Sequence, residues 1–261
     1  MSVGYGKSHE HLGFGDKYVW ALNFAGTPLE VARRRGNDDV YAYLLERSST
    51  PVRLLQACRR GDLAAIAEFL DSDPDLLPSL SADEVSGMLG GTLGAVQMLL
   101  EFGADPNALD DDNAATALHQ ASWDGDRERI TLLLEHGADP TIRDGTHGGT
   151  PIGWAHHAGH TDLVEMYAER GPLDIVDAAW LGKTDRVREI LEADPSMVNG
   201  PQGEQISPLR SAAWYGQTEV VRLLLESGAD PAVPHPESGK TALDFATERG
   251  HEEIAGLLAD S

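Results

Sequence analysis

The chain has a single cysteine, Cys58, among its 261 residues. One cysteine cannot form a disulfide within the chain, so the sequence predicts a protein of a reducing compartment. Cys58 ends the run Leu55-Gln-Ala-Cys, where small and apolar residues follow a helical spacing. We interpret it as a small buried hydrophobe rather than a catalytic or redox thiol.

Basic residues are also scarce, with 20 Lys and Arg against 43 Asp and Glu and a formal net charge of −23. Binding to nucleic acid or to an anionic membrane requires a lysine- and arginine-rich surface, so we expect neither partner. The sequence shows no signal peptide and no run of the ~20 apolar residues that a membrane span needs. It therefore predicts a cytoplasmic protein, which we expect to be a monomer without a cofactor.

What the chain does contain is one pattern repeated at a fixed interval. Three pairs of like residues lie 34 positions apart: Thr116 and Thr150, Ala121 and Ala155, and Gly125 and Gly159. The glycine recurs in steps of 25, 30, 34, 34, 23, 34 and 34 residues, at Gly36, Gly61, Gly91, Gly125, Gly159, Gly182, Gly216 and Gly250. A glycine commonly ends a helix, so this series predicts eight helix pairs with one such glycine closing each first helix.

Other short motifs recur in phase with these glycines. Five first helices open with Thr27-Pro-Leu, Thr116-Ala-Leu, Thr150-Pro-Ile, Ser207-Pro-Leu and Thr241-Ala-Leu, and Gly-Ala-Asp-Pro follows three second helices at Gly103, Gly137 and Gly228. These motifs resemble the ankyrin-repeat family, in a bacterial-type array with degenerate terminal repeats; its repeat has about 33 residues and a Thr-Pro-Leu-His-x-Ala opening. The resemblance covers nearly the whole chain. It implies an all-α solenoid of about eight stacked helix pairs with short projecting loops.

The unequal steps predict how the chain is organised. Steps of 25 and 23 residues leave no room for the hairpin that projects between typical repeats. We therefore expect projecting loops near 108–114, 142–148, 200–206 and 233–239, and none near 48–53 or 171–174. The order of motifs also suggests a tandem duplication within one continuous solenoid: residues 1–25 form a leader or N-terminal cap, 26–148 a first four-pair unit and 149–261 a second.

The third helix pair departs furthest from the repeat pattern. Four glycines crowd it: Gly87, Gly90, Gly91 and Gly94. Each glycine inside a helix costs up to about 1 kcal/mol relative to alanine. The pair is therefore expected to be either the weakest repeat or one in which two backbones approach closely.

Charge is unevenly distributed along the sequence. Seven of the 20 basic residues are arginines between positions 33 and 60, whereas residues 61–126 contain fourteen Asp or Glu and no Lys or Arg. This distribution is consistent with a solvated acidic surface or with a bipolar binding face. The sequence leaves both interpretations open.

In the ankyrin family, the two residues before each terminal glycine line the concave groove. Here they include four arginines and several large side chains: Arg34, Arg35, Arg59, Arg60, Trp123, Asp124, His157, Trp180, Leu181, Trp214 and Tyr215. Arginine, tryptophan and tyrosine are enriched among interface anchors, so we expect the groove to bind a protein segment or a small organic ligand. Anchoring tryptophans should be substantially exposed. The alternative is that these rings only pack between repeats.

An enzymatic alternative can also be built from these positions. Asp124 and His157 would serve as acid and base, with Trp123, Trp180 and Trp214 as the walls of a pocket. Four residues of the projecting loops, which we call finger-loop residues, would lie nearby: Asp111, Asp112, Asp144 and His147. No catalytic motif accompanies them, so we assign no catalytic residue and expect a binding protein.

The remaining histidines have structural interpretations. His156 and His160 are four residues apart, as in a zinc-binding helix, but Gly159 should end that helix first, so no metal is expected. His119 stands at the histidine of the family's opening motif, which implies a hydrogen bond to backbone between repeats.

Overall fold

The computed structural model describes residues 27–200 and 207–261. Within these residues the chain forms seventeen α-helices, one 3-10 helix and no strand, which confirms the all-α prediction. The leader predicted for residues 1–25 lies outside the described part. By its internal contacts the chain divides into two compact units, residues 27–118 with 128–138, and residues 119–127 with 139–261. None of the helices in the described part is long and apolar enough to cross a membrane.

The first unit is a series of short antiparallel helix pairs. Its helices are α2 (Pro28–Arg34), α3 (Asp38–Glu46), α4 (Thr50–Arg60), α5 (Leu63–Ser72), α6 (Leu76–Ser79), α7 (Ala82–Leu89), α8 (Leu93–Glu101) and all but the first residue of α10 (Arg127–Glu135). The first helices of successive pairs pack on each other, α4 on α7, and so do the second helices, α5 on α8. The core between them is made of fully buried aliphatic side chains such as Leu54, Ile66 and Leu99.

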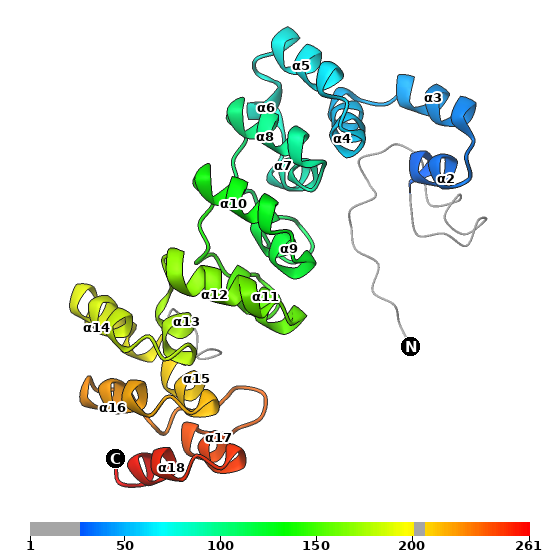
Figure 1. Ribbon diagram of the computed structural model, residues 1–261. Helices are drawn as coiled ribbons and strands as arrows, with labels where there is room; N and C mark the ends of the chain where they lie inside the picture. The colour runs from blue at the N-terminus through cyan, green and yellow to red at the C-terminus, as the bar shows by residue number, and fades with distance from the viewer. Residues whose placement is uncertain (1–26, 201–206) are drawn as a thin grey trace. The chain divides into compact units, whose positions relative to one another are not determined.

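The second unit follows the same plan. Its helices are most of α9 (Ala117–Asp124), then α11 (Pro151–Ala158), α12 (Thr161–Arg170), α13 (Ile175–Trp180), α14 (Thr184–Ala193), the 3-10 helix η2 (Pro195–Asn199), α15 (Pro208–Tyr215), α16 (Thr218–Glu226), α17 (Ala242–Arg249) and α18 (Glu252–Ala259). First helices α13, α15 and α17 stack in one layer, and second helices α14, α16 and α18 stack in the other (Figure 1).

Local sequence explains where these helices begin. The Thr150 hydroxyl accepts a hydrogen bond from the Gly153 amide at 3.3 Å, so the side chain before Pro151 caps α11. Thr241 and Asp244 form a reciprocal capping box at the start of α17. Such caps satisfy amides that have no partner inside the helix, and proline at the first position has no amide to satisfy.

A glycine follows the end of each first helix, as predicted. Seven of the eight predicted glycines have a positive φ, for example 86° at Gly159, a backbone conformation that glycine adopts at little cost. Gly91 follows the end of α7 in the same place, but its φ is not positive. A Cβ at Gly91 would lie 2.8 Å from the Cys58 carbonyl oxygen, and the Thr92 amide donates to that oxygen at 3.0 Å. Close approach of two backbones therefore explains this glycine.

The projecting loops lie where the repeat spacing predicts them. Three hairpin-like turns are closed by backbone hydrogen bonds: Asp110 to Ala115, Asp144 to Gly149 and His235 to Lys240. Residues 201–206, in the fourth predicted loop, lie outside the described part. Short links at residues 47–49 and 171–174 join α3 to α4 and α12 to α13 without a hairpin. A one-turn helix follows both α5 and α14, α6 in the first case and η2 in the second, and the duplication with its boundaries stays a prediction.

Candidate binding surface

Three of the predicted groove tryptophans occupy equivalent positions in the second unit. In each case the residue after a terminal glycine reaches back to the tryptophan carbonyl of the preceding first helix: His160 Nε2 to Trp123 at 3.0 Å, Gln217 Nε2 to Trp180 at 2.9 Å and His251 Nε2 to Trp214 at 3.3 Å. These bonds satisfy carbonyls at helix ends. They also give His160 a structural role that does not involve a metal.

Exposure differs among these tryptophans. Trp123 keeps 47% of its surface exposed, whereas Trp180 and Trp214 are half-buried. The expectation that all three are substantially exposed therefore holds for Trp123 alone. Tyr215, next to Trp214, is 40% exposed. In the described part of the second unit, Trp123 and Tyr215 are the large hydrophobic side chains that remain exposed.

An aromatic cluster joins three successive first helices. The rings of His156 on α11, Trp180 on α13 and Tyr215 on α15 have centroids 4.9 to 5.6 Å apart. The Tyr215 hydroxyl lies 3.1 Å from His156 Nε2, within hydrogen-bond distance. Burial, with a smaller contribution from His157, lowers the pKa of His156 below its usual value. A neutral imidazole can accept this bond, so the pair fits together at neutral pH.

Two further ring contacts flank this cluster in sequence. The rings of Trp123 and Trp154 pack edge to face with their centroids 6.0 Å apart, and those of Trp214 and Phe245 pack in the same way with their centroids 5.3 Å apart. The guanidinium of Arg249 lies 4.1 Å from the centre of a Trp214 ring. Each predicted tryptophan therefore contacts a ring of a neighbouring first helix. Such packing between repeats is what the alternative expects, but it does not show that packing is the sole role of these rings.

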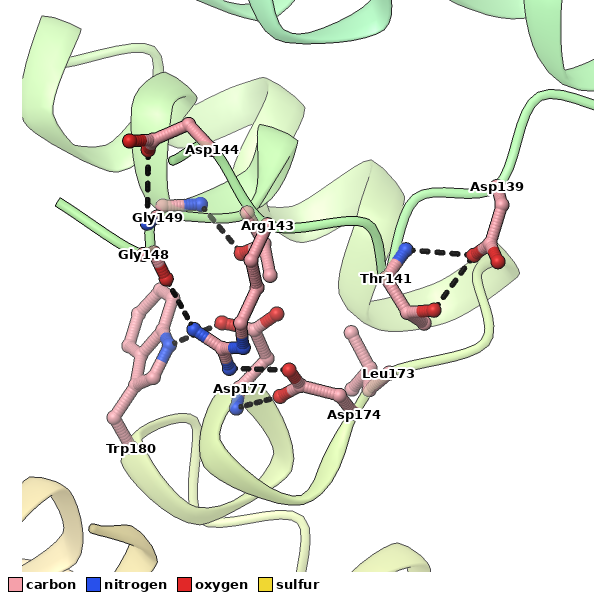
Figure 2. A network of polar contacts seen from close by, with 12 residues as sticks. Asp139, Thr141, Arg143, Asp144, Gly148, Gly149, Leu173, Asp174, Asp177 and Trp180 are labelled. Carbon is pink, nitrogen blue, oxygen red and sulfur yellow. Dashed lines mark hydrogen bonds and ion pairs between the residues drawn. The ribbon is translucent and has the colours of Figure 1, made fainter. Parts of the chain in front are cut away.

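A network of polar contacts connects Trp180 with the start of α13 and with the loop before α11 (Figure 2). The Trp180 indole donates from Nε1 to Asp177 Oδ1 at 2.9 Å. Asp174 caps α13 by accepting from the Asp177 amide at 2.8 Å. Arg143, in the loop before α11, forms an ion pair with Asp174 and donates to the Gly148 carbonyl. These contacts hold the Trp180 indole against Asp177 and, through Asp174 and Arg143, connect it to the loop before α11.

Asp177 is the most unusual ionisable group of the network. Its side chain is 4% exposed and its neighbour Asp174 is a second carboxylate. Burial first and the charge of Asp174 second raise the pKa of Asp177 to about 7, despite the opposing effects of the Trp180 hydrogen bond and of Arg143. Removing a carboxylate from water disfavours its charged form, and a like charge beside it adds to the effect.

Asp144 follows Arg143 in the loop before α11 and forms hydrogen bonds that hold this loop in place. It is buried, and its carboxylate accepts hydrogen bonds from the amides of Thr146, His147 and Gly149 and from the Trp154 indole. Burial raises the pKa of Asp144, but these hydrogen bonds outweigh it and hold the pKa below its usual value. Asp144 organises the loop and is not free for acid–base chemistry.

The sequence profile of ankyrin repeats in three copies matches residues 54–144, 87–177 and 175–261. These matches together span well over half of the sequence. The chain belongs to the ankyrin-repeat family.

Searches beyond the profile add little to this assignment. No curated protein matches the sequence. Among solved structures, a similar one is an ankyrin repeat domain from Acinetobacter baumannii AYE, determined at 1.00 Å; it is 25% identical, covers 80% of this chain and 96% of its own, and has a TM-score of 0.42. The assignment rests on the profile, because a TM-score this low carries no weight. Ankyrin arrays are generally protein-interaction scaffolds.

Asp124 and His157, the acid and base of the enzymatic alternative, lie in the last turns of α9 and α11 of this ankyrin array. Asp124 and His157 are both exposed, and Asp124 accepts a hydrogen bond from Gln120 at 3.0 Å. Within the described residues, no hydrogen bond or ion pair joins Asp124 to His157. The ring that contacts Trp180 and Tyr215 is that of His156, which directly precedes His157.

The other predicted residues lie in separate places. Among the finger-loop residues, the Asp111 amide donates to Asp83, while Asp112 and His147 have exposed side chains. Leu181 is half-buried. The histidine prediction for the opening motif is confirmed, because His119 Nε2 lies 3.1 Å from the Gly149 carbonyl oxygen in the next repeat. The predicted arginines Arg34, Arg35, Arg59 and Arg60 are exposed in the first unit.

Sequence reasoning missed four residues that build the surface: His156, Arg143, Asp174 and Asp177. A signal for the two aspartates was available. They stand three residues apart at the start of a first helix, the spacing of a capping residue and its partner, and Asp177 falls within an otherwise apolar helix. A charged residue in such a position needs a buried partner. No comparable pattern marks Arg143.

Proposed function

We propose that this ankyrin array is a binding scaffold whose second unit recognises a protein segment through an aromatic surface formed by Trp123, His156, Trp180, Trp214 and Tyr215. The observation that carries the proposal is the exposure of Trp123 and Tyr215. Both lie in the last turn of a first helix, while the other large hydrophobic side chains in the described part of this unit are at least half-buried. Tryptophan and tyrosine are typical interface anchors.

The exposed area is large enough to matter for affinity. An aromatic side chain covers about 150–250 Å², so the exposed fractions of 47% and 40% leave roughly 80–100 Å² uncovered on each ring. At about 25 cal/mol per Å², covering one of these rings contributes roughly 2 kcal/mol. That value is the usual scale of an interface hot spot.

The surface is also held in place before any partner binds. Asp177 fixes the Trp180 indole, and His156 lies within hydrogen-bond distance of the Tyr215 hydroxyl. Side chains that are already ordered lose less conformational entropy on binding. A suitable segment therefore presents apolar side chains to the rings and a polar group to the Tyr215 hydroxyl.

The proposal can be tested without knowing the natural partner. Peptides would be selected from a random display library against the full chain and their dissociation constants measured. We expect Tyr215→Ser to weaken the selected peptides by 10-fold or more. Phe102→Ser is the matched control, because Phe102 is 45% exposed but lies in the first unit. Peptides that bind Tyr215→Ser as tightly as the unaltered protein would count against the aromatic surface.

A further inference from the structure

The first unit carries a positively charged patch in a strongly acidic protein. Four exposed arginines lie in the last turns of two first helices, Arg33 and Arg34 on α2 and Arg59 and Arg60 on α4. These helices approach each other, since Arg59 Nη1 lies 3.4 Å from Glu30 Oε1 of α2. We call these four residues the arginine patch.

Little negative charge among the described residues neutralises this patch. Glu30 bridges to Arg59, and its carboxylate also accepts from the Thr27 amide in the capping box of α2. Among the described residues, no carboxylate lies within ion-pair distance of Arg33, Arg34 or Arg60. Arg60 instead faces the Tyr41 ring, 5.8 Å from its centre. Three guanidinium groups thus remain available to an outside anion.

Helix stability alone does not account for the patch. A cation near a helix C-terminus is favourable by only ~0.3–1 kcal/mol. First helices α7, α9, α13 and α15 have no basic residue in their last turn and form nonetheless. The arginine pairs that end the two successive first helices α2 and α4 also repel one another electrostatically.

We propose that the arginine patch binds an acidic protein segment, at a site separate from the aromatic surface and independent of its function. Guanidinium groups pair with carboxylates through two parallel hydrogen bonds, and every basic residue from position 33 to position 60 is arginine rather than lysine. The charge of the remaining chain favours a short segment over a nucleic acid. Residues 61–126, which follow directly, carry fourteen acidic residues and no Lys or Arg, so they repel a polyanion that extends beyond the patch.

A fluorescently labelled deca-glutamate peptide tests this site by fluorescence anisotropy at low salt. The chain as a whole carries a net charge of −23 and repels such a peptide, so binding requires a local basic site. We expect a measurable dissociation constant below 1 mM that weakens as salt is raised. The triple variant R33Q/R34Q/R60Q removes the three guanidinium groups that have no carboxylate partner among the described residues, and it should weaken binding by 10-fold or more.

A matched control removes the same charge elsewhere. The variant R186Q/R188Q/R222Q loses three arginines of the second unit, each of which pairs with an acidic side chain, and should change binding by less than about 2-fold. Equal weakening by both triple variants, or no binding at millimolar peptide, overturns the proposal. Tighter patch-dependent binding of a ten-nucleotide DNA strand overturns it in favour of nucleic acid. Tyr215→Ser should leave deca-glutamate binding unchanged, which separates this test from that of the aromatic surface.

Discussion

Replacing Asp177 by asparagine should change how the stability of the protein depends on pH. The folded state raises the pKa of this carboxyl from 3.8 to about 7, so the folded protein binds the proton more tightly than the unfolded chain does. The stabilisation from this proton is fully present below pH 3.8, declines as pH rises and is lost above about pH 7. Asparagine can still accept from the Trp180 indole but does not ionise.

The size of the effect follows from the same pKa. One pKa unit corresponds to ~1.4 kcal/mol, so ionising Asp177 costs the folded state about 4 kcal/mol in total. Most of this cost falls between pH 5 and pH 8. Over that interval the unaltered protein should lose about 3 kcal/mol of stability relative to Asp177→Asn, because groups that do not interact with Asp177 titrate alike in both proteins.

Urea unfolding followed by tryptophan fluorescence at pH 5, 6, 7 and 8 measures this difference. Asp244→Asn is the control, because Asp244 is an exposed capping residue whose pKa is lowered by its bonds to Thr241. Its contribution to stability is lost only on acidification, so its difference from the unaltered protein should stay constant from pH 5 to pH 8. A constant difference for Asp177→Asn as well would refute the reasoning about the buried carboxyl.

Three further outcomes are expected from buried positions. Gly91→Ala should destabilise the fold by ~1–3 kcal/mol, since its Cβ would lie 2.8 Å from a carbonyl oxygen, whereas Gly94→Ala has room and should be neutral or stabilising in thermal unfolding. Cys58 should react with a thiol reagent only as fast as the protein opens, because burial raises its pKa to about 12. Tyr167→Phe should cost about 1 kcal/mol in urea unfolding by removing the buried 2.7 Å hydrogen bond between the Tyr167 and Ser122 hydroxyls.

Much of the fold was predictable because residues that start and end helices recur at regular intervals along the sequence. The in-phase glycines and the Thr-Pro openings predicted the helix pairs, and the short steps predicted that no hairpin would project near 48–53 or 171–174. The backbone conformation of Gly91 could not be predicted. A glycine that ends a helix and one that admits a neighbouring backbone are identical in sequence, and only the position of the Cys58 carbonyl distinguishes them.

The candidate site was predictable only in outline. The register of the tryptophans followed from helix geometry, whereas the ring contacts of His156 with Trp180 and Tyr215 were not expected. Asp144 was expected on a finger and does lie in that loop, yet its carboxylate turns inward to the loop amides. The direction in which a loop side chain points depends on hydrogen bonds that sequence spacing does not encode.

The measurement that tests the aromatic surface most directly compares two free energies for Trp123→Ser in the full chain. One is the free energy of unfolding in urea, and the other is the free energy of binding a peptide selected on the unaltered protein. Because Trp123 is 47% exposed, we expect about 2 kcal/mol lost from stability and about 2 kcal/mol or more lost from binding. A stability loss of ~3–5 kcal/mol with unchanged binding, the behaviour of a core tryptophan, would contradict the assignment of this surface to recognition.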